Sequence, residues 1–298
     1  MNIHKITCYF QLLKFRLSLT VVFSAIAGYL LGPNLFDFSE FIKLFFGGFL
    51  VTGAANSFNQ IWEQDFDRLM ERTSKRPLPQ RNISVFSALI FSVFSAVIGL
   101  FILYEINQYC AFYGLASILI YVFLYTPLKR ISPFSIFVGA VPGAIPFLLG
   151  WVANYDFIPM SSKFDSGFGV ESGTLFFIQF LWQLPHFIAI SWVLDSQYKK
   201  AGFKMMLGGV KGKKASFVAM IFSFLLMFAS VSPFVLDTGD LKLSFFSFCI
   251  VLLLGILFLY TAINLHRFQN DVSAKKLMYA SFIYLPAIQI ILVVDKYI

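Results

Sequence analysis

Residues 41–62, FIKLFFGGFLVTGAANSFNQIW, form an apolar run that is long enough to cross a bilayer as a helix. The run ends in the sequence EQDFD at 63–67, which a basic loop follows at once. A carboxylate costs roughly 2.5–3.5 kcal/mol at the centre of a membrane helix. We therefore expect three acids at the end of such a run to have a partner that offsets this cost.

The rest of the chain repeats this apolar pattern. Of its 298 residues 58% are hydrophobic and 13% are charged. Nothing in it alternates as a strand does, so the membrane spans should be helices. The predicted fold is all-α: a polytopic membrane protein of one domain, 1–298, with nine transmembrane helices in a single bundle around a central cavity. The nine predicted spans are 17–35, 41–62, 84–104, 108–126, 134–152, 173–194, 215–236, 243–264 and 277–295.

The basic residues predict the orientation of the bundle. If the N-terminus is cytoplasmic, the non-cytoplasmic side holds only Lys43, Lys163, Lys242 and Lys296 of the 23 lysines and arginines, as the positive-inside rule expects. The C-terminus is then external. The net charge of +8 is thus explained by topology and gives no support for nucleic-acid binding. Residues 1–16 lack the composition of an organelle transit peptide, which favours a multi-pass protein of the bacterial plasma (inner) membrane. The cysteines are far apart and predict neither a disulfide nor a metal framework.

The acidic cluster predicts a metal site near the cytoplasmic face. On a helix, Asn59, Glu63 and Asp67 share one face, and oxygen ligands of this kind suit Mg²⁺ holding a diphosphate. Asp65 points off that face and joins only if the helix unwinds. The alternative is an interfacial ladder of ion pairs, with Arg68 or Arg72 as the partner.

Basic side chains on the same side of the membrane could neutralise a diphosphate. Most of them have a second explanation in topology and lipid contact. The candidates for diphosphate binding are Arg72, Lys75, Arg76, Lys129, Arg130 and Lys199. Further along the chain, the span LFFIQFLWQLPHFIAISWVLD at 175–195 contains polar residues in mid-membrane. A buried, hydrogen-bonded core residue is the default interpretation of its His186, with metal contact or proton handling as the alternative.

Several strings together resemble the protohaem IX farnesyltransferase (haem O synthase) branch of the UbiA-type intramembrane prenyltransferases. They are NQIWEQDFDRLMERTSKRPLP at 59–79, YTPLKRISPFSIFVGAVPGAIPFLLGW at 125–151, and LWQLPHF at 181–187 with YKKAGFKMM at 198–206. The first helix, KFRLSLTVVFSAIAGYLL at 14–31, is also similar to that of the family. Beyond Leu207 only the pattern matches.

The resemblance implies a reaction and assigns roles. Farnesyl diphosphate and haem b would give haem O and diphosphate with Mg²⁺ as the cofactor, and a haem A synthase or oxidase assembly factor is a possible partner. Asn59, Glu63 and Asp67 match the family's Asn-xxx-Asp-xxx-Asp motif, with glutamate in place of the usual aspartate. Asp65 and Asp195 are further metal candidates, and Trp182, Gln183 and His186 are candidates for haem contact. Phe15 replaces a more usual proline.

Two other functions remain open from the residues. One is a prenyltransferase for a quinone precursor or another aromatic acceptor, which normally needs a fuller second acidic motif. Asp195 is the only acid at that place in this chain. The other is a cation-coupled transporter, which would need a path to the outside.

Overall fold

In the computed structural model, residues 3–155, 169–236 and 238–298 are described, and the regular elements of these segments are all helices. Eight of them are long and apolar enough to cross a membrane, and the bent pair α1–α2, with an angle of 41°, makes a ninth candidate. The chain is therefore an integral membrane protein, and the all-α bundle is confirmed; its central cavity stays a prediction. The predicted external loop 153–172 lies largely outside the described residues.

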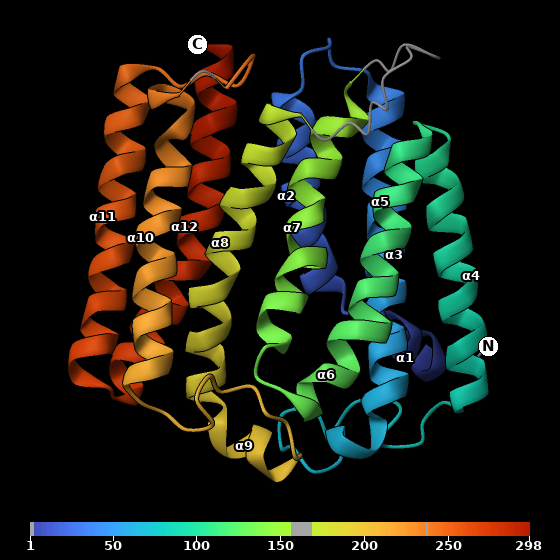
Figure 1. Ribbon diagram of the computed structural model, residues 1–298. Coiled ribbons are helices and arrows are strands. Elements are labelled where there is room, and N and C mark those ends of the chain that lie inside the picture. The colour runs from blue at the N-terminus through green and yellow to red at the C-terminus, as the bar shows by residue number, and fades with distance from the viewer. Residues whose placement is uncertain (1–2, 156–168, 237) are drawn as a thin grey trace.

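The helices pack side by side, with the N- and C-termini toward opposite ends of the bundle (Figure 1). In chain order they are α1 (Ile3–Leu12), α2 (Phe15–Leu31), α3 (Phe38–Asp67), α4 (Val85–Tyr104), α5 (Gln108–Leu119), a π-helix η1 (Ile120–Tyr125), α6 (Thr126–Ile131), α7 (Ser135–Ala153), α8 (Val170–Val193), α9 (Asp195–Lys200), α10 (Lys213–Val235), α11 (Phe245–Phe268) and α12 (Asp271–Tyr297).

The helix bounds differ from the prediction mainly where polar residues extend a helix past its apolar run. The span 41–62 continues to Asp67, so the acids are helical, and the span 108–126 continues through η1 and α6 to Ile131. The first span ends earlier than predicted, because α2 stops at Leu31 before Gly32 and Pro33.

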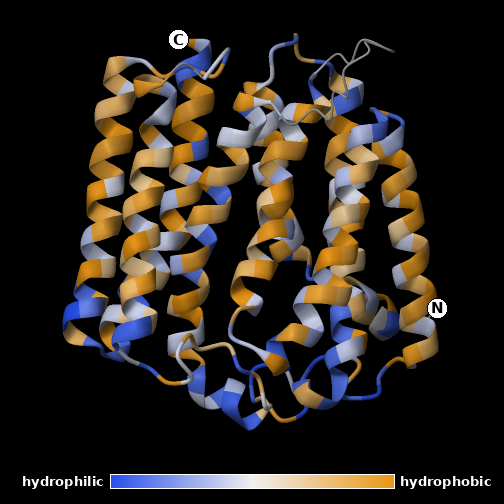
Figure 2. Cartoon of the chain, viewed as in Figure 1, coloured by the Kyte–Doolittle hydropathy of each residue, from blue (hydrophilic) through white to orange (hydrophobic). Residues whose placement is uncertain are grey.

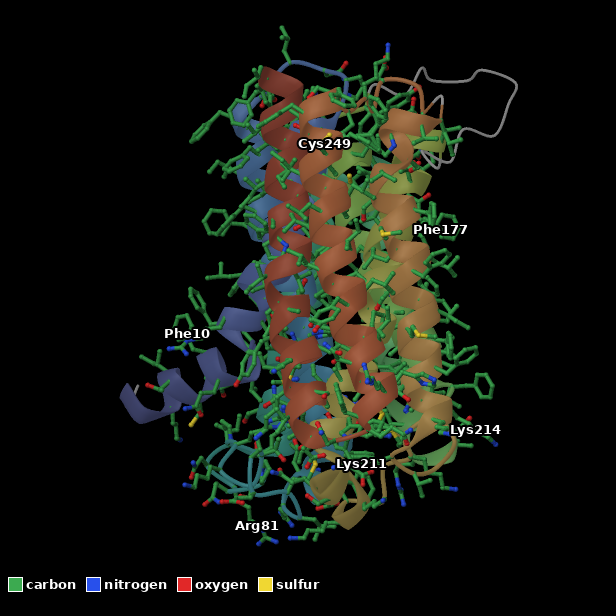
Figure 3. All side chains as sticks on the ribbon, turned by 90° about the vertical axis from the view of Figure 1, so that its left-hand side faces the viewer. Phe10, Arg81, Phe177, Lys211, Lys214 and Cys249 are labelled. Atoms are coloured by element: carbon green, nitrogen blue, oxygen red, sulfur yellow. The ribbon has the colours of Figure 1, made fainter. Side chains whose placement is uncertain are left out.

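Hydrophobic residues predominate along the lengths of the helices, and hydrophilic residues gather at the two ends (Figure 2). We call the lower end in Figure 1 the basic end; it contains α6, α9 and the loop 68–84. Arg81, Lys211 and Lys214 lie there, whereas α1 projects sideways from the bundle with Phe10 on its outer side (Figure 3).

Helix α7 lies at the centre and packs against both α2 and α8. Its contact with α2 depends on glycine, because a Cβ on Gly150 would lie 1.8 Å from the carbonyl oxygen of Ala25, and one on Gly28 would lie 2.1 Å from that of Phe147. This close approach joins α2 to the centre of the bundle.

Candidate active site

The last two turns of α3 carry the predicted acidic face. Asn59, Glu63 and Asp67 are 2%, 5% and 1% exposed, so all three side chains are buried. The C-terminus of a helix carries partial negative charge, which makes it an unfavourable place for carboxylates. Two buried acids at this position therefore need cations close by.

Each of the two buried acids has one cation. Lys129 Nζ of α6 lies 2.6 Å from Glu63 Oε1, and Arg76 Nη1 of the following loop donates to Asp67 Oδ2 at 2.7 Å. Lys129 is itself only 8% exposed. Neither partner belongs to the alternative ladder, in which Arg68 or Arg72 would pair with Glu63 or Asp67. The bonds cross between α3, α6 and the loop and draw these three segments together.

Two carboxylate oxygens remain without a hydrogen bond among the described residues. They are Glu63 Oε1, whose one recorded contact is the ion pair with Lys129, and Asp67 Oδ1, which has neither a hydrogen bond nor an ion pair there. A buried carboxylate oxygen without a hydrogen bond is costly. Both oxygens fit ligands of a divalent cation, since Mg²⁺ prefers one or two carboxylates together with phosphate oxygens.

Asn59 is oriented by a chain of two hydrogen bonds. The hydroxyl of Thr126 donates to the carbonyl of Tyr121 at 2.8 Å, so its oxygen must accept the 3.0 Å bond from Asn59 Nδ2. This bond fixes the orientation of the amide, and Asn59 Oδ1 is a candidate for a third oxygen ligand. The three-residue set Asn59, Glu63 and Asp67 therefore fits a magnesium ion.

The π-helix explains how the Tyr121 carbonyl reaches Thr126. In a π-turn the backbone bond runs from residue i+5 to residue i, so the Tyr121 carbonyl accepts both the backbone N–H and the hydroxyl of Thr126. Such turns often occur at functional sites. It also orients Tyr125, whose ring lies under Lys129 with Nζ 4.6 Å from the ring centroid. The sequence analysis missed Tyr121, Tyr125 and Thr126 as site residues. For Tyr125 and Thr126 the available signal was their place in the string YTPLK at 125–129, and no such signal marks Tyr121.

Lys14 is a further site residue that the sequence did not indicate. It lies between α1 and α2 in a left-handed conformation, φ 47°, which is uncommon for a residue with a side chain. Its Nζ donates to Asn56 Oδ1 at 3.2 Å, and Glu63, Asp67, Arg76 and Lys129 all lie close enough to act on its charge. No spacing in the chain connects residue 14 with residue 63, so only the fold brings them together.

The segment that follows α9 packs against α6 beside Lys129. Lys204 N–H donates to the carbonyl of Lys129 at 2.7 Å, and the Phe203 ring lies 5.8 Å from Lys129 Nζ. The backbone N–H of Arg72 donates to Gln197 Oε1 at 3.4 Å. These contacts connect the segment after α9 to α6, and α9 itself to the loop 68–84, at the basic end.

The other predicted polar residues lie further out. Asp65 is exposed and pairs with Arg68 at 3.3 Å, as expected for a residue off the acidic face. Asp195 pairs with Lys199 at 2.8 Å, and no three acid, histidine or cysteine side chains of the described segments converge on one point. Arg72, Lys75 and Lys199 are exposed, as is Arg130, which lies 4.2 Å over the Phe66 ring. Arg76 and Lys129 are thus the two predicted cations that pair with the buried acids.

The polar residues of α8 face two different neighbours. Gln183 donates to the carbonyl of Ala140 on α7 at 3.3 Å, whereas Trp182 and His186 face α12. The ring of His186 hydrogen-bonds Ser281 and stacks on Trp182 with the ring centroids 4.6 Å apart. The expectation of a buried, hydrogen-bonded histidine is therefore met at one of the two ring nitrogens.

Two curated relatives match nearly the whole chain. A protoheme IX farnesyltransferase of Christiangramia forsetii is 44% identical over 288 residues, 97% of this chain and 93% of that protein. One of Flavobacterium psychrophilum is 43% identical over 291 residues, 97% of this chain and 94% of that protein. The match extends beyond Leu207, where the resemblance noted in the sequence was limited to the pattern of residues.

Solved structures share the fold. A digeranylgeranylglyceryl phosphate synthase superposes with a TM-score of 0.80 at 23% identity, over 98% of both chains. A UbiA homologue from Archaeoglobus fulgidus, bound to GPP and Mg²⁺, superposes with a TM-score of 0.65 at 15% identity, over 96% of this chain and 99% of that one. The model of the UbiA prenyltransferase family matches residues 21–285, and the chain therefore belongs to this family.

Proposed function

We propose that the protein transfers the farnesyl group of farnesyl diphosphate to a vinyl group of haem b and produces haem O. Carbon 1 of the farnesyl group leaves diphosphate and bonds to the terminal vinyl carbon. Water then supplies a hydroxyl to the neighbouring vinyl carbon and releases one proton, so one farnesyl diphosphate, one haem b and one water give one haem O, one diphosphate and one proton. The names of the relatives support the choice of both substrates.

The observation that carries the proposal is a pair of buried carboxylates, each ion-paired with one cation, in which Asp67 Oδ1 is left without a partner among the described residues. Glu63 and Asp67 would hold Mg²⁺ together with Asn59. Bound there, Mg²⁺ would supply positive charge to the diphosphate as the allylic bond breaks. The archaeal homologue bound to GPP and Mg²⁺ supports a divalent cation as the cofactor. A second metal near Asp195 stays a prediction.

The cations of the chain itself act on the leaving group. Lys129 and Arg76 lie at the two acids, and Lys14 lies across from them. Their charge stabilises the diphosphate most where water is excluded, and the burial of Lys129 provides this condition. Arg72, Lys75, Arg130 and Lys199 are exposed at the rim, where they would attract the diphosphate before it is bound.

A row of aromatic side chains begins beside Lys129. Tyr125 lies under Lys129 and stacks on Phe187 with the ring centroids 6.4 Å apart. Their π-faces would stabilise positive charge on the farnesyl group and exclude water from it. Trp182, Gln183 and His186 on α8 are the candidates for contact with the haem.

The charge distribution predicts how the enzyme is oriented in its membrane. We place the basic end at the cytoplasmic face of a bacterial plasma membrane, because loops on that side carry most of the lysines and arginines. The diphosphate then enters from the cytoplasm, whereas farnesyl and haem stay within the bilayer. A haem A synthase or oxidase assembly partner stays a prediction.

The reaction is tested with purified protein in lipid nanodiscs that receive haem b, farnesyl diphosphate and Mg²⁺. We expect haem O, detected by its mass and longer retention in reversed-phase chromatography, and stoichiometric diphosphate. Parallel samples contain 4-hydroxybenzoate in place of haem b. Prenylation of this aromatic acid with no change in haem b would overturn the proposal in favour of an aromatic acceptor.

A further inference from the structure

Two ion pairs make the acidic end of α3 a group that is neutral as a whole. Glu63 pairs with Lys129 at 2.6 Å, and Asp67 pairs with Arg76 at 2.7 Å. Lys14 adds a further positive charge, because it lies close enough to both acids for their charges to act on it. The two carboxylates therefore already have as many cations beside them as they have negative charges.

A divalent cation bound to these acids would have to share them with Lys129 and Arg76. Lys129 is 8% exposed and Glu63 is 5% exposed, so water and dissolved salt screen their surroundings little. A divalent cation that arrived alone would raise the charge of the two ion pairs from zero to +2, before Lys14 is counted. Repulsion between cations in this buried place therefore opposes binding of the metal by itself.

The enclosure of the acids also opposes a free ion. Glu63 Oε1 and Asp67 Oδ1 are both buried, although Asp67 Oδ1 has no partner among the described residues. Mg²⁺ loses its bound water reluctantly, and in proteins it usually has phosphate oxygens among its ligands. An ion that enters this group therefore needs a companion that replaces its water.

A prenyl diphosphate is a companion of the right charge. It carries about three negative charges when fully ionised, so its complex with one Mg²⁺ carries about one. This complex supplies oxygen ligands to the ion, and its charge balances that of Lys14. The group then stays close to neutral, whereas the bare metal would leave it strongly positive.

Lys129 and Arg76 are both able to contact such a complex. The Lys129 ammonium lies 4.6 Å from the centroid of the Tyr125 ring and 5.8 Å from that of the Phe203 ring, whose π-faces would stabilise it when it leaves Glu63. A guanidinium has five N–H donors, and Arg76 uses one of them on Asp67. The others are available to phosphate oxygens while this bond persists.

We propose that Lys129 and Arg76 keep a free divalent cation off Glu63 and Asp67, so that metal and prenyl diphosphate bind as one complex. Lys129 then transfers its ion pair from Glu63 to the diphosphate. This inference rests on the function proposed above and gives the two cations a task before the reaction begins. The coupling is reciprocal, since the metal raises the affinity for diphosphate by the same factor as diphosphate raises that for the metal.

The test measures metal binding by full-length protein in phosphatidylcholine nanodiscs without haem. Mn²⁺ is the probe, because the unbound ion gives an electron paramagnetic resonance signal, and farnesyl thiolodiphosphate replaces the reactive substrate. The wild-type protein should bind Mn²⁺ about 100-fold more tightly with this analogue than without it. Nanodiscs that lack protein correct for the complex formed in solution. Equal affinity under the two conditions overturns the proposal.

The role of Lys129 is tested by removing its charge. Without the analogue, Lys129→Met should bind Mn²⁺ about tenfold more tightly than the wild type, because the repulsion is weaker. The matched control is Lys204→Met, since Lys204 is exposed and contacts the Lys129 carbonyl through its backbone N–H. Its affinity for Mn²⁺ alone should equal that of the wild type. A purely structural role of Lys129 would not tighten metal binding, so unchanged or weaker binding in folded Lys129→Met overturns the proposal.

Arg76→Gln is the second variant, and it decides if Lys129→Met does not fold. The glutamine amide can still donate to Asp67, while the positive charge is lost. Tighter binding of Mn²⁺ alone supports the proposal, and unchanged binding overturns it.

The outcomes separate this inference from the proposed function. Wild-type protein that makes haem O but binds Mn²⁺ equally with and without the analogue overturns the inference and leaves the function standing. Coupled binding in a protein that makes no haem O supports the inference and counts against haem b as the acceptor.

Discussion

At the scale of single residues, the site depends on buried charges that are each only partly satisfied. Asp67 has one oxygen bonded to Arg76 and one without a hydrogen bond among the described residues. A residue with only a structural role would be expected to satisfy both oxygens. The geometry therefore connects the burial of this acid to its proposed role as a metal ligand.

Replacing Asp67 by Asn keeps the shape of the side chain and removes its charge. We expect haem O formation to fall by about 100-fold or more, because the diphosphate loses its metal ligand. The matched control is Asp65→Asn, since Asp65 is exposed and pairs only with Arg68. Turnover is measured as haem O per minute in nanodiscs, and near-normal turnover in Asp67→Asn would contradict the metal role.

Lys14 offers a second test that the sequence did not suggest. Lys14→Met should raise the KM for farnesyl diphosphate about tenfold, a loss of roughly 1.4 kcal/mol, and leave the KM for haem b unchanged. Arg16→Gln, at an exposed position two residues on, is the control. Equal KM values for farnesyl diphosphate in the two variants would show that Lys14 does not bind the diphosphate and contributes only to membrane topology.

At the scale of elements, the π-helix η1 positions α6, which follows it directly. Its Tyr121 carbonyl accepts both the backbone N–H and the hydroxyl of Thr126, and Thr126 in turn orients Asn59. One irregular turn thus connects the span α5–η1–α6 to the acidic end of α3. A regular helix would rotate Thr126 and Lys129 relative to that face.

Thr126→Val removes the hydroxyl and keeps the branched shape. We expect kcat to fall, because the Asn59 amide loses its fixed orientation, and the free energy of unfolding to fall by about 1 kcal/mol. Thr126→Ser retains the hydroxyl and should behave like the wild type. The measurements are steady-state kinetics and thermal unfolding. Equal kcat values in the valine and serine variants would show that the Asn59 amide does not need the Thr126 hydroxyl as a hydrogen-bond partner.

At the scale of the whole molecule, the two ends of the bundle have different tasks. The basic end gathers α6, α9 and two loops around the buried acids, and the opposite end carries the C-terminus (Figure 1). Helix α7 is the most buried of the candidate membrane spans, since 72% of its apolar stretch is buried inside the molecule. This central helix holds the two halves of the bundle together and so fixes the basic end.

The orientation of the bundle is tested by labelling single cysteines. In a background with Cys249 replaced by serine, Arg81→Cys at the basic end should react with a membrane-impermeant maleimide only in inside-out vesicles. Leu35→Cys, at the opposite end and 93% exposed, should react only in right-side-out vesicles. Cys8 and Cys110 are buried and should stay unlabelled in both. The reverse pattern would place the site at the external face.

The sequence by itself determined the helical class, the number of spans and the acidic face of Asn59, Glu63 and Asp67, because apolar run length and helical period are local properties of the chain. Only the tertiary structure decided the partners. Lys129 and Arg76 at the acids, Lys14 across from them and Ser281 at His186 come from segments between 9 and 95 residues away in the chain. Side chains so distant meet only when the helices pack, and close contacts such as that of Gly150 with α2 set this packing.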